Sequence, residues 1–335
     1  MSRFSKEIPM QRRHLLQALG LSAASASLGR PSWAQAAPPV RLTLPSPGSA
    51  GSAWRPLVEK LKLADPSLNL EWVVADPGKM QTQLSAGSLD IGVFGAVGLA
   101  TLVNRGSDIV LFGPALNNHG RWLVRGDSPY RTPKDLVGKT IASTAETSET
   151  YQQARIAASL GGIDLKKDVK VIFGSPTANL ALFERGDVDA IITLEPTASR
   201  LVGRGAREIA RVADQWRQAT GGAAGGEDPF LVGLAASRKW LDANPQTAAK
   251  VVALFQKTNG AIRQDPALLT TVSADMGLKR DETQAAALLP KRLAPAYATE
   301  WNDKVFATID KQLETAVALG ILDKLPAHKI YRRIG

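Results

Sequence analysis

Short apolar runs alternate with helical stretches along the first two thirds of the chain. The runs are bounded by glycine, proline and small polar residues, and they have the length and residue types of buried β-strands. Amphipathic stretches between them, such as Ala53–Lys62 and Tyr151–Leu160, have helical periodicity. Strands and helices that alternate at this pace indicate an α/β fold with a largely parallel sheet and helices on both faces. The pattern predicts strands at Val40–Pro45, Leu68–Ala75, Asp90–Phe94, Ile109–Leu116, Trp122–Arg125, Lys139–Ser143, Val188–Thr193 and Phe230–Ala236.

The pattern changes after Trp240, where helical segments follow one another without strands between them. Pro245 and Pro266 stand where helices start, and Gly320 stands where a helix stops. A helical C-terminal region therefore follows the α/β part. Its predicted helices are Asn244–Asp265, Pro266–Met276, Asp281–Leu289 and Trp301–Leu319.

The first 36 residues have the pattern of an export signal. Basic residues up to position 13 precede a mild apolar stretch, Leu15–Leu28, and Ala34-Gln35-Ala36 forms a small-x-small cleavage site. The apolar stretch is shorter than the ~20 residues that a membrane-spanning helix requires. We therefore expect a cleaved signal peptide at residues 1–36, with Ala34 and Ala36 at the cleavage site, and a mature protein in the periplasm.

A pair of arginines gives the export route. Arg12 and Arg13 stand just before Leu15-Leu16, and this arrangement resembles the twin-arginine export motif. Gln11 and Gln17 replace the hydroxyl or acidic residue and the lysine that usually flank the pair. The twin-arginine route is predicted, and the general secretory route is the alternative.

Charge and cysteine content narrow the class of protein. The whole chain has a formal net charge of +10, and residues 37–335 keep a dispersed charge of +6. No run of Lys and Arg is interleaved with aromatic residues, so nucleic-acid binding is not predicted. The chain has no cysteine, which excludes disulfides, a thiol nucleophile, thiolate metal ligands and a lipid anchor on cysteine. Its length and its 44% hydrophobic content are enough for two α/β domains.

The sequence signatures of catalysis and metal binding are missing. The chain has no Gly-x-Ser-x-Gly elbow, no phosphate-binding loop and no His-Glu-x-x-His motif. Beyond the leader, His119 and His328 are the two histidines, and neither has a partner at metal-ligand spacing. The sequence therefore predicts a protein that is not an enzyme and that needs no metal and no cofactor.

Hydroxyl side chains follow the predicted strand at 139–143 and precede the predicted helix at 151–160. A helix N-terminus offers unpaired backbone N–H groups and the positive end of the helix dipole to a small polar ligand. A second apolar strand carries Glu195-Pro196 at its carboxyl end. Ligands of open α/β sheets bind at such strand ends. The hydroxyl residues are Ser143, Thr144, Thr147, Ser148 and Thr150.

Three short sequence motifs in this region resemble motifs of the solute-binding proteins of ABC transporters. The similarity is to the nitrate/sulfonate/taurine-type branch, which shares its fold with the thiamine-pyrimidine precursor family. The motifs are Arg125-Gly126-Asp127-Ser128-Pro129, Asp135-Leu136-Val137-Gly138-Lys139-Thr140-Ile141-Ala142 and Gly186-Asp187-Val188-Asp189-Ala190.

The resemblance implies a type II periplasmic binding protein with two α/β lobes joined by two crossover strands. Residues 37–122 and 230–335 would form lobe 1, and residues 123–229 would form lobe 2. Trp122–Arg125 and Phe230–Ala236 would be the crossovers that act as a hinge, with the ligand cleft between the lobes. The expected partners are a small solute and an inner-membrane ABC permease, and the protein is expected to be a monomer.

Four loops would face this cleft, at Ser46–Ser52, Gly95–Gly98, Ser143–Ser148 and Glu195-Pro196. Glycines allow close backbone approach, and hydroxyls supply short-range donors. Alternatives stay open, because Ser143 and Ser148 would also suit helix caps, Trp54 a core position, and Asn118 a turn. The candidate ligand-binding residues are Ser49, Ser52, Trp54, Gly95, Ala96, Asn118, Ser143, Thr144, Thr147, Ser148 and Glu195.

The sequence leaves the charge of the ligand open. Helix N-termini and Arg121 favour an anion, whereas Glu146, Glu149 and Glu195 would repel one or would bind an amine or a pyrimidine. On the family resemblance, we predict capture of a small organic anion of the sulfonate, nitrate or carboxylate class by hinge closure. A pyrimidine or amine ligand, or a sensor that presents its ligand to a membrane receptor, is the alternative. The pyrimidine synthase that shares this fold needs a cysteine-rich motif, which this chain lacks.

Overall fold

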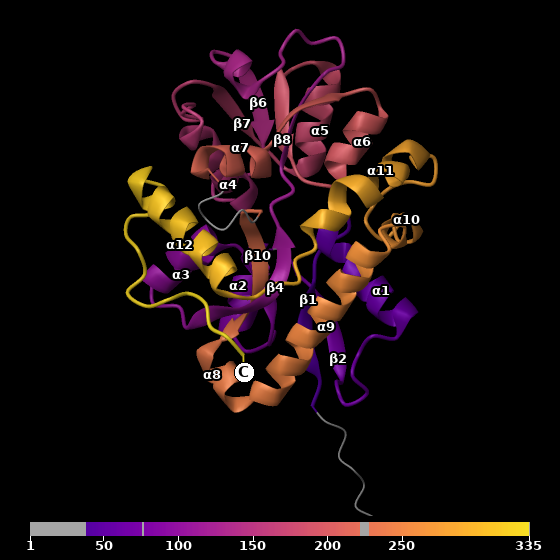
Figure 1. Cartoon of the computed structure of the whole chain (residues 1–335), viewed down its shortest axis with the longest axis vertical. Helices are drawn as coiled ribbons and strands as arrows, with labels where there is room; N and C mark the ends of the chain where they lie inside the picture. The colour runs from indigo at the N-terminus through magenta and orange to yellow at the C-terminus, as the bar shows by residue number, and fades with distance from the viewer. Residues whose placement is uncertain (1–37, 76, 222–227, 335) are drawn as a thin grey trace, which may run out of the picture. The chain divides into compact units, whose positions relative to one another are not determined.

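Three β-sheets form the frame of the chain, which a computed structural model describes at residues 38–75, 77–221 and 228–334 (Figure 1). The expected leader, with Arg12, Arg13, Ala34 and Ala36, lies outside the described residues. No helix in the described ranges is both long enough and apolar enough to cross a membrane.

The N-terminal strands form two small sheets. Strand β1 (Val40–Leu44) pairs in parallel with β2 (Leu70–Val74). Strand β10 (Phe230–Ser237) lies between β3 (Gly92–Phe94) and β4 (Ile109–Asn117), and it is antiparallel to both. The largely parallel sheet expected from the sequence is therefore wrong for this part, because the chain returns here through β10 and runs against its neighbours.

A five-stranded sheet is formed by the middle of the chain. Its order is β7-β6-β8-β5-β9, in which β6 is parallel to β7 and β8, and β5 is antiparallel to β8 and β9. Its strands are β5 (Arg121–Val124), β6 (Thr140–Ser143), β7 (Lys170–Phe173), β8 (Ala190–Thr193) and β9 (Arg207–Arg211).

Helices cover these sheets and form the C-terminal region, as the sequence predicts. Proline opens α5 and α9, and serine side chains cap α4, α5 and α8. The α-helices are α1 (Trp54–Leu61), α2 (Pro77–Ser85), α3 (Ala96–Asn104), α4 (Glu149–Leu160), α5 (Pro176–Arg185), α6 (Thr197–Gly203), α7 (Val212–Thr220), α8 (Arg238–Ala243), α9 (Pro245–Gln264), α10 (Leu268–Thr271), α11 (Thr283–Leu293) and α12 (Asp303–Ala318). Short 3-10 turns occupy Ala50–Ala53, Pro133–Leu136 and Ala294–Ala296.

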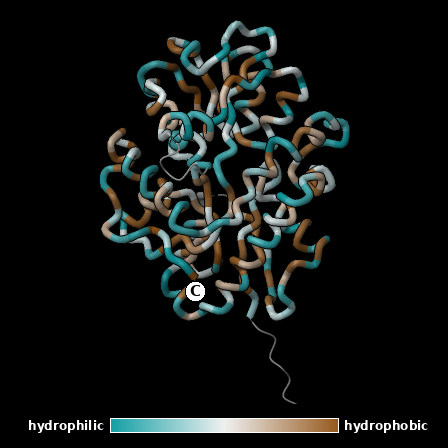
Figure 2. Tube along the Cα trace, in the orientation of Figure 1, coloured by the Kyte–Doolittle hydropathy of each residue, from teal (hydrophilic) through white to brown (hydrophobic). Residues whose placement is uncertain are grey.

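Apolar residues of the strands and of the covering helices make up the core. In Figure 2 the central strands β4 and β10 carry hydrophobic stretches, while many peripheral loops are hydrophilic. All residues of β4 except the last are buried. Helix α9 packs on β4, and α12 packs on α3. This packing holds the loops at the strand ends in fixed positions.

Two connections run between the three-stranded and the five-stranded sheets. The first, Asn118–Gly120, joins β4 to β5, and the second leads from α7 to β10 and includes Pro229. The Asn118 N–H donates to the Pro229 carbonyl at 2.8 Å, so the two connections lie side by side. The crossover strands expected at Trp122–Arg125 and Phe230–Ala236 correspond to β5 and β10, each of which is the first strand after a connection and is paired on both sides.

Candidate functional site

The carboxyl group of Glu149 lies at the N-terminus of α3. Glu149 is the first residue of α4, and its Oε2 accepts from the Gly98 N–H at 3.2 Å. Its Oε1 lies 3.5 Å from the Val97 N and accepts from Gln153 Nε2 at 2.7 Å. The contact joins the predicted loop 95–98 to the residue that directly follows the predicted loop 143–148. A carboxylate therefore occupies a helix end that favours negative charge.

Gly95 makes room for this carboxyl group. A Cβ atom built at Gly95 would overlap the Cγ, Cδ and Oε2 atoms of Glu149. The backbone of Gly95 is extended, with φ of −83°, so space rather than conformational freedom requires glycine here. Ala96 follows as the first residue of α3 and is fully buried. The prediction that glycine permits close approach at this loop agrees with this contact.

Desolvation dominates the electrostatics of Glu149. Burial raises the pKa of its carboxyl group, and hydrogen bonds from Gln153, Gly98 and Val97 oppose that rise. No cationic group among the described residues affects this pKa. Backbone dipoles and neutral donors are thus the groups that favour the charged form of this carboxyl group.

The hydroxyl residues before α4 mostly hydrogen bond within their own loop. Ser148 is the N-cap residue of α4, and its Oγ accepts from the Tyr151 N–H at 3.3 Å. The Oγ1 of Thr144 lies 2.6 Å from that same Oγ, and Thr147 is exposed. Ser143 is different, because its Oγ is buried and has no hydrogen-bond partner among the described residues. Ser148 is therefore a helix cap, as the alternative expects. The Ser143 hydroxyl, in contrast, makes no hydrogen bond among the described residues.

The cap predicts a measurable difference between two neighbouring residues. Ser148→Ala should lower the free energy of unfolding by about 1 kcal/mol, because the Tyr151 N–H loses its acceptor. Thr147→Ala is the matched control and should change it by less than about 0.5 kcal/mol, since its side chain is exposed. Urea unfolding of both variants measures the difference, and equal losses would contradict the capping role.

The candidates near the start of the chain are also held by local contacts. Ser49 donates to the Ser46 carbonyl at 3.0 Å, and Ser52 donates to the Ser49 carbonyl at 2.7 Å. Trp54 belongs to the core, since it is 1% exposed and its Nε1 donates to Asn259 Oδ1 at 3.0 Å. Its ring packs 4.8 Å from that of Phe255. The core alternative therefore describes Trp54.

Glu195 is the centre of a buried ion-pair network. Its Oε1 accepts from Arg292 Nε at 2.8 Å and lies 3.5 Å from Arg121 Nε. Its Oε2 accepts from the Ser199 N–H at 2.9 Å. Glu208 contacts both arginines, at 3.2 Å from Arg121 and 2.7 Å from Arg292. This network joins α11 to the five-stranded sheet and neutralises the Glu195 charge.

Asn118 and His119 lie in the first connection between the sheets. Asn118 Oδ1 accepts from the Gly120 N–H at 2.8 Å, as the turn alternative expects. His119 is 3% exposed, and its Nδ1 lies 3.1 Å from the Asn117 carbonyl. Burial lowers the pKa of His119 to about 4, so the ring is neutral at neutral pH.

Two exposed apolar side chains lie at the carboxyl ends of strands. Val74 ends β2, and Phe173 ends β7, with exposed fractions of 60% and 41%. The Phe173 ring meets that of Tyr151 edge to face, at 4.9 Å. Exposed apolar side chains at strand ends can contact the apolar part of a ligand.

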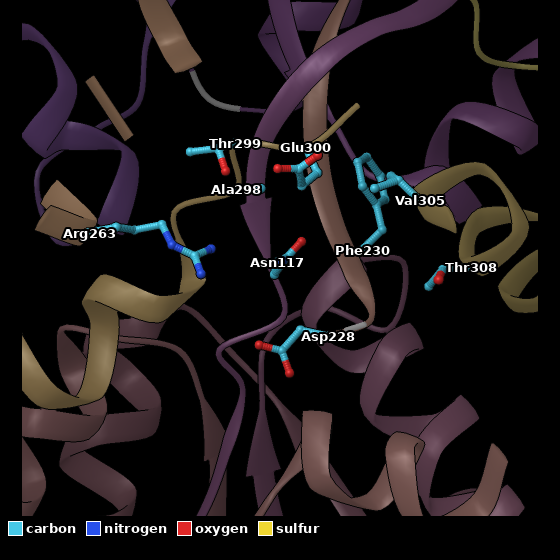
Figure 3. Close-up of a pocket in the computed structure, with 9 residues that line it drawn as sticks. All are labelled: Asn117, Asp228, Phe230, Arg263, Ala298, Thr299, Glu300, Val305 and Thr308. Atoms are coloured by element: carbon cyan, nitrogen blue, oxygen red, sulfur yellow. The ribbon is translucent and has the colours of Figure 1, made fainter. Parts of the chain in front are cut away.

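A small cavity lies beside the connections and away from the predicted loops (Figure 3). Asn117, Asp228 and Phe230 line it on one side, and Thr299 and Glu300 line it on another. Its volume of about 30 Å³ suits a water molecule rather than a solute. None of the sequence-predicted site residues lines it. Among the described residues, no cluster of His, Asp or Glu is arranged to hold a metal ion.

Gln153 and Arg292 are missing from the sequence analysis, and Glu149 enters it only as a charge that would repel an anion or bind an amine or a pyrimidine. Each acts through a partner on another element or turn, as Glu149 does with Gly98, 51 residues earlier, and Arg292 with Glu195, 97 residues earlier. One local signal was available. The run Gly95-Ala96-Val97-Gly98 at a strand end indicates that another group approaches closely, although it does not say which group.

Comparisons with known proteins address the class of this protein. A family model described as "ABC transporter, phosphonate, periplasmic substrate-binding protein" matches residues 45–221. The alkanesulfonate-binding protein SsuA from Xanthomonas axonopodis pv. citri, solved bound to MOPS, is 22% identical, with a TM-score of 0.70 over 89% of this chain and 100% of that chain. The aliphatic sulphonate binding protein SsuA from Escherichia coli, also 22% identical, has a TM-score of 0.67 over 86% of this chain and 90% of that chain. At these identities the two structures show a shared fold.

An enzyme is also among the similar proteins. The ATP phosphoribosyltransferase of Solidesulfovibrio magneticus is 25% identical over 255 residues, which cover 74% of this chain and 75% of that protein. The family model and the two solved structures are of substrate-binding proteins, not of enzymes. We attribute the likeness to the transferase to a related binding-protein-like fold.

Proposed function

Because this chain belongs to the periplasmic substrate-binding family of ABC phosphonate transporters, we propose that it captures one small organic anion and presents it to its permease. The anion is of the sulfonate, phosphonate, nitrate or carboxylate class. Binding proteins of ABC importers deliver small solutes to a membrane permease, and no chemical step is required. The location that the family implies is the periplasm.

The observation that carries the proposal is the carboxylate at the N-terminus of α3. Here the Gly98 N–H donates to a negatively charged group, and Gly95 leaves the space that the group needs. This helix end therefore accepts an oxyanion through backbone donors. The buried and unpaired Ser143 hydroxyl lies in the neighbouring predicted loop and can add a further donor.

Of the three carboxyl groups expected to oppose an anion, Glu195 and Glu146 are compensated by basic residues and Glu149 is not. Glu195 is paired with Arg121 and Arg292, and it is fully buried. Glu146, on the predicted loop, pairs with Lys166 at 2.9 Å. Repulsion of an anion by these two carboxylates is thereby reduced. Phe173 and Val74 supply apolar surface for the organic part of the solute.

The two lobes are part of the proposal. Residues 37–122 with 230–335 would move as one body and residues 123–229 as the other. Asn118–Gly120 and Asp228-Pro229 are better hinge segments than the strands first expected, because strands paired on both sides cannot bend without losing their hydrogen bonds. Arg121 and Trp122, which pair in β5, would then move with residues 123–229. Closure would bury the solute between the lobes of a monomer. The signal peptide at 1–36 would direct export by the twin-arginine route.

A thermal-shift screen tests the proposed function. Ethanesulfonate, methylphosphonate, nitrate and benzoate are compared with ethylamine and a pyrimidine at equal ionic strength. An anion at 100 times its dissociation constant should add about 2.7 kcal/mol to the free energy of unfolding. Stabilisation by the amine or the pyrimidine, with none by any anion, would contradict the proposal.

A further inference from the structure

We propose that the Glu149 carboxylate is an internal competitor of the solute: it occupies the anion-binding end of α3, and a bound anion must displace it. The inference rests on the proposed function, since it concerns the same site. It assigns to Glu149 control over which anions bind and how tightly.

Glu149 is not needed to cap its own helix. Ser148 fills that place, with its Oγ accepting from the Tyr151 N–H. The Glu149 carboxylate instead reaches α3, 51 residues earlier in the chain, and bonds to the Gly98 N–H. These bonds are the ones that an oxyanion of a solute would make at the same helix end. The Glu149 carboxylate already fills the N-terminus of α3, and a second anion brought beside it would be repelled.

A chain of buried amide side chains holds the carboxylate in place. Gln153 donates to Glu149 Oε1 at 2.7 Å, and Gln312 of α12 donates to Gln153 Oε1 at 2.7 Å. Gln312 Nε2 also donates to the Phe230 carbonyl at 2.9 Å, at the start of β10. Both glutamines are at most 1% exposed. Displacing Glu149 therefore changes a hydrogen-bond chain that ends at the strand leading away from the second connection.

The carboxylate is held by neutral hydrogen-bond donors only. It has no cationic partner among the described residues that would hold it by an ion pair, and its burial is unfavourable for the charged form. A solute oxyanion with three oxygens can accept more hydrogen bonds than the carboxylate. The site then selects anions that compete successfully with the Glu149 carboxylate for the N-terminus of α3. When the solute leaves, Glu149 can refill the helix end.

The test compares Glu149→Gln with Glu146→Gln. The two substitutions remove the same charge three residues apart, but Glu146 is half exposed and pairs with Lys166. Calorimetric titration of the full-length protein with ethanesulfonate and methylphosphonate gives the dissociation constants. We expect Glu149→Gln to bind at least about fivefold more tightly than the wild type, as a coupling between two competing ligands would give. Glu146→Gln should differ from the wild type by less than about twofold, because exposed charges are screened.

Each outcome decides a separate point. Wild-type binding that is unchanged or weakened by Glu149→Gln overturns the inference and leaves the proposed function standing. Binding by the variant alone supports a built-in competitor. Binding of neither probe to any form rejects both the inference and the proposed function for these classes. If Glu149→Gln does not fold, as its circular dichroism would show, Glu149→Ala is titrated with the same expectation.

Discussion

Glu195→Gln is expected to lower the free energy of unfolding by about 3–5 kcal/mol, because it breaks a buried ion-pair network. The Glu195 side chain is fully buried, and that of Arg121 is 4% exposed. Removing this carboxylate leaves Arg121 and Arg292 to share Glu208 alone. A buried guanidinium without its partner keeps its desolvation cost and loses the compensating attraction. Urea unfolding at neutral pH measures the loss.

Glu184→Gln is the matched control for this prediction. Glu184 also pairs with an arginine, Arg204, but both side chains are at least 40% exposed. Exposed ion pairs contribute less than about 1 kcal/mol, so this variant should remain close to the wild type. Equal losses in the two variants would show that burial does not determine the strength of the Glu195 network.

Acid should destabilise the protein through His119 by about 3 kcal/mol between pH 6.5 and pH 4. The histidine has its ordinary pKa near 6.5 in the unfolded chain, and burial lowers the pKa to about 4 in the folded state. Over this range the unfolded state binds the proton and the folded state does not. The stabilisation is therefore complete above pH 6.5 and is lost as the pH falls towards 4. Glu195 opposes the lowering of this pKa, and Arg121 adds to it.

Unfolding free energies of the wild type and of His119→Gln at a series of pH values isolate this contribution. The variant should lose about 3 kcal/mol less than the wild type between pH 6.5 and pH 4. His328→Gln makes the same substitution at an exposed histidine and should keep the wild-type slope. A slope that His119→Gln leaves unchanged would show that other groups cause the acid sensitivity.

The apolar pattern predicts most of the strands but not their directions. β1, β4 and β8 were predicted within two residues of their bounds, because β4 and β8 are largely apolar runs and β1 alternates apolar with polar residues. β9 was missed, because it is a charged strand, Arg-Glu-Ile-Ala-Arg, at the edge of its sheet, where neither face is fully buried. β10 was found but not its antiparallel pairing. Strand direction depends on where the chain re-enters the sheet, and no local pattern encodes that.

The sequence predicts which loops belong to the candidate site but not which side chains contact one another there. The sequence singles out the small residues Gly95–Gly98, which Glu149 contacts, and the hydroxyl run Ser143–Ser148, which directly precedes Glu149; their place at a ligand site stays a prediction. The partner of each side chain was not predictable, because it is set by tertiary packing. Hydroxyls expected to face a ligand, such as that of Ser148, satisfy backbone groups nearby. Glu149, which the sequence analysis treats as a charge that acts on the ligand, instead bonds to another helix.

The central claim is that the N-terminus of α3 binds the anionic group of the solute. A crystal structure of the protein with the anion that stabilises it most, from the thermal-shift screen, tests this most directly. The account predicts an oxygen of that anion within hydrogen-bond distance of the Gly98 N–H, with the Glu149 carboxylate moved away. An anion bound elsewhere, with Glu149 still bonded to Gly98, would contradict it.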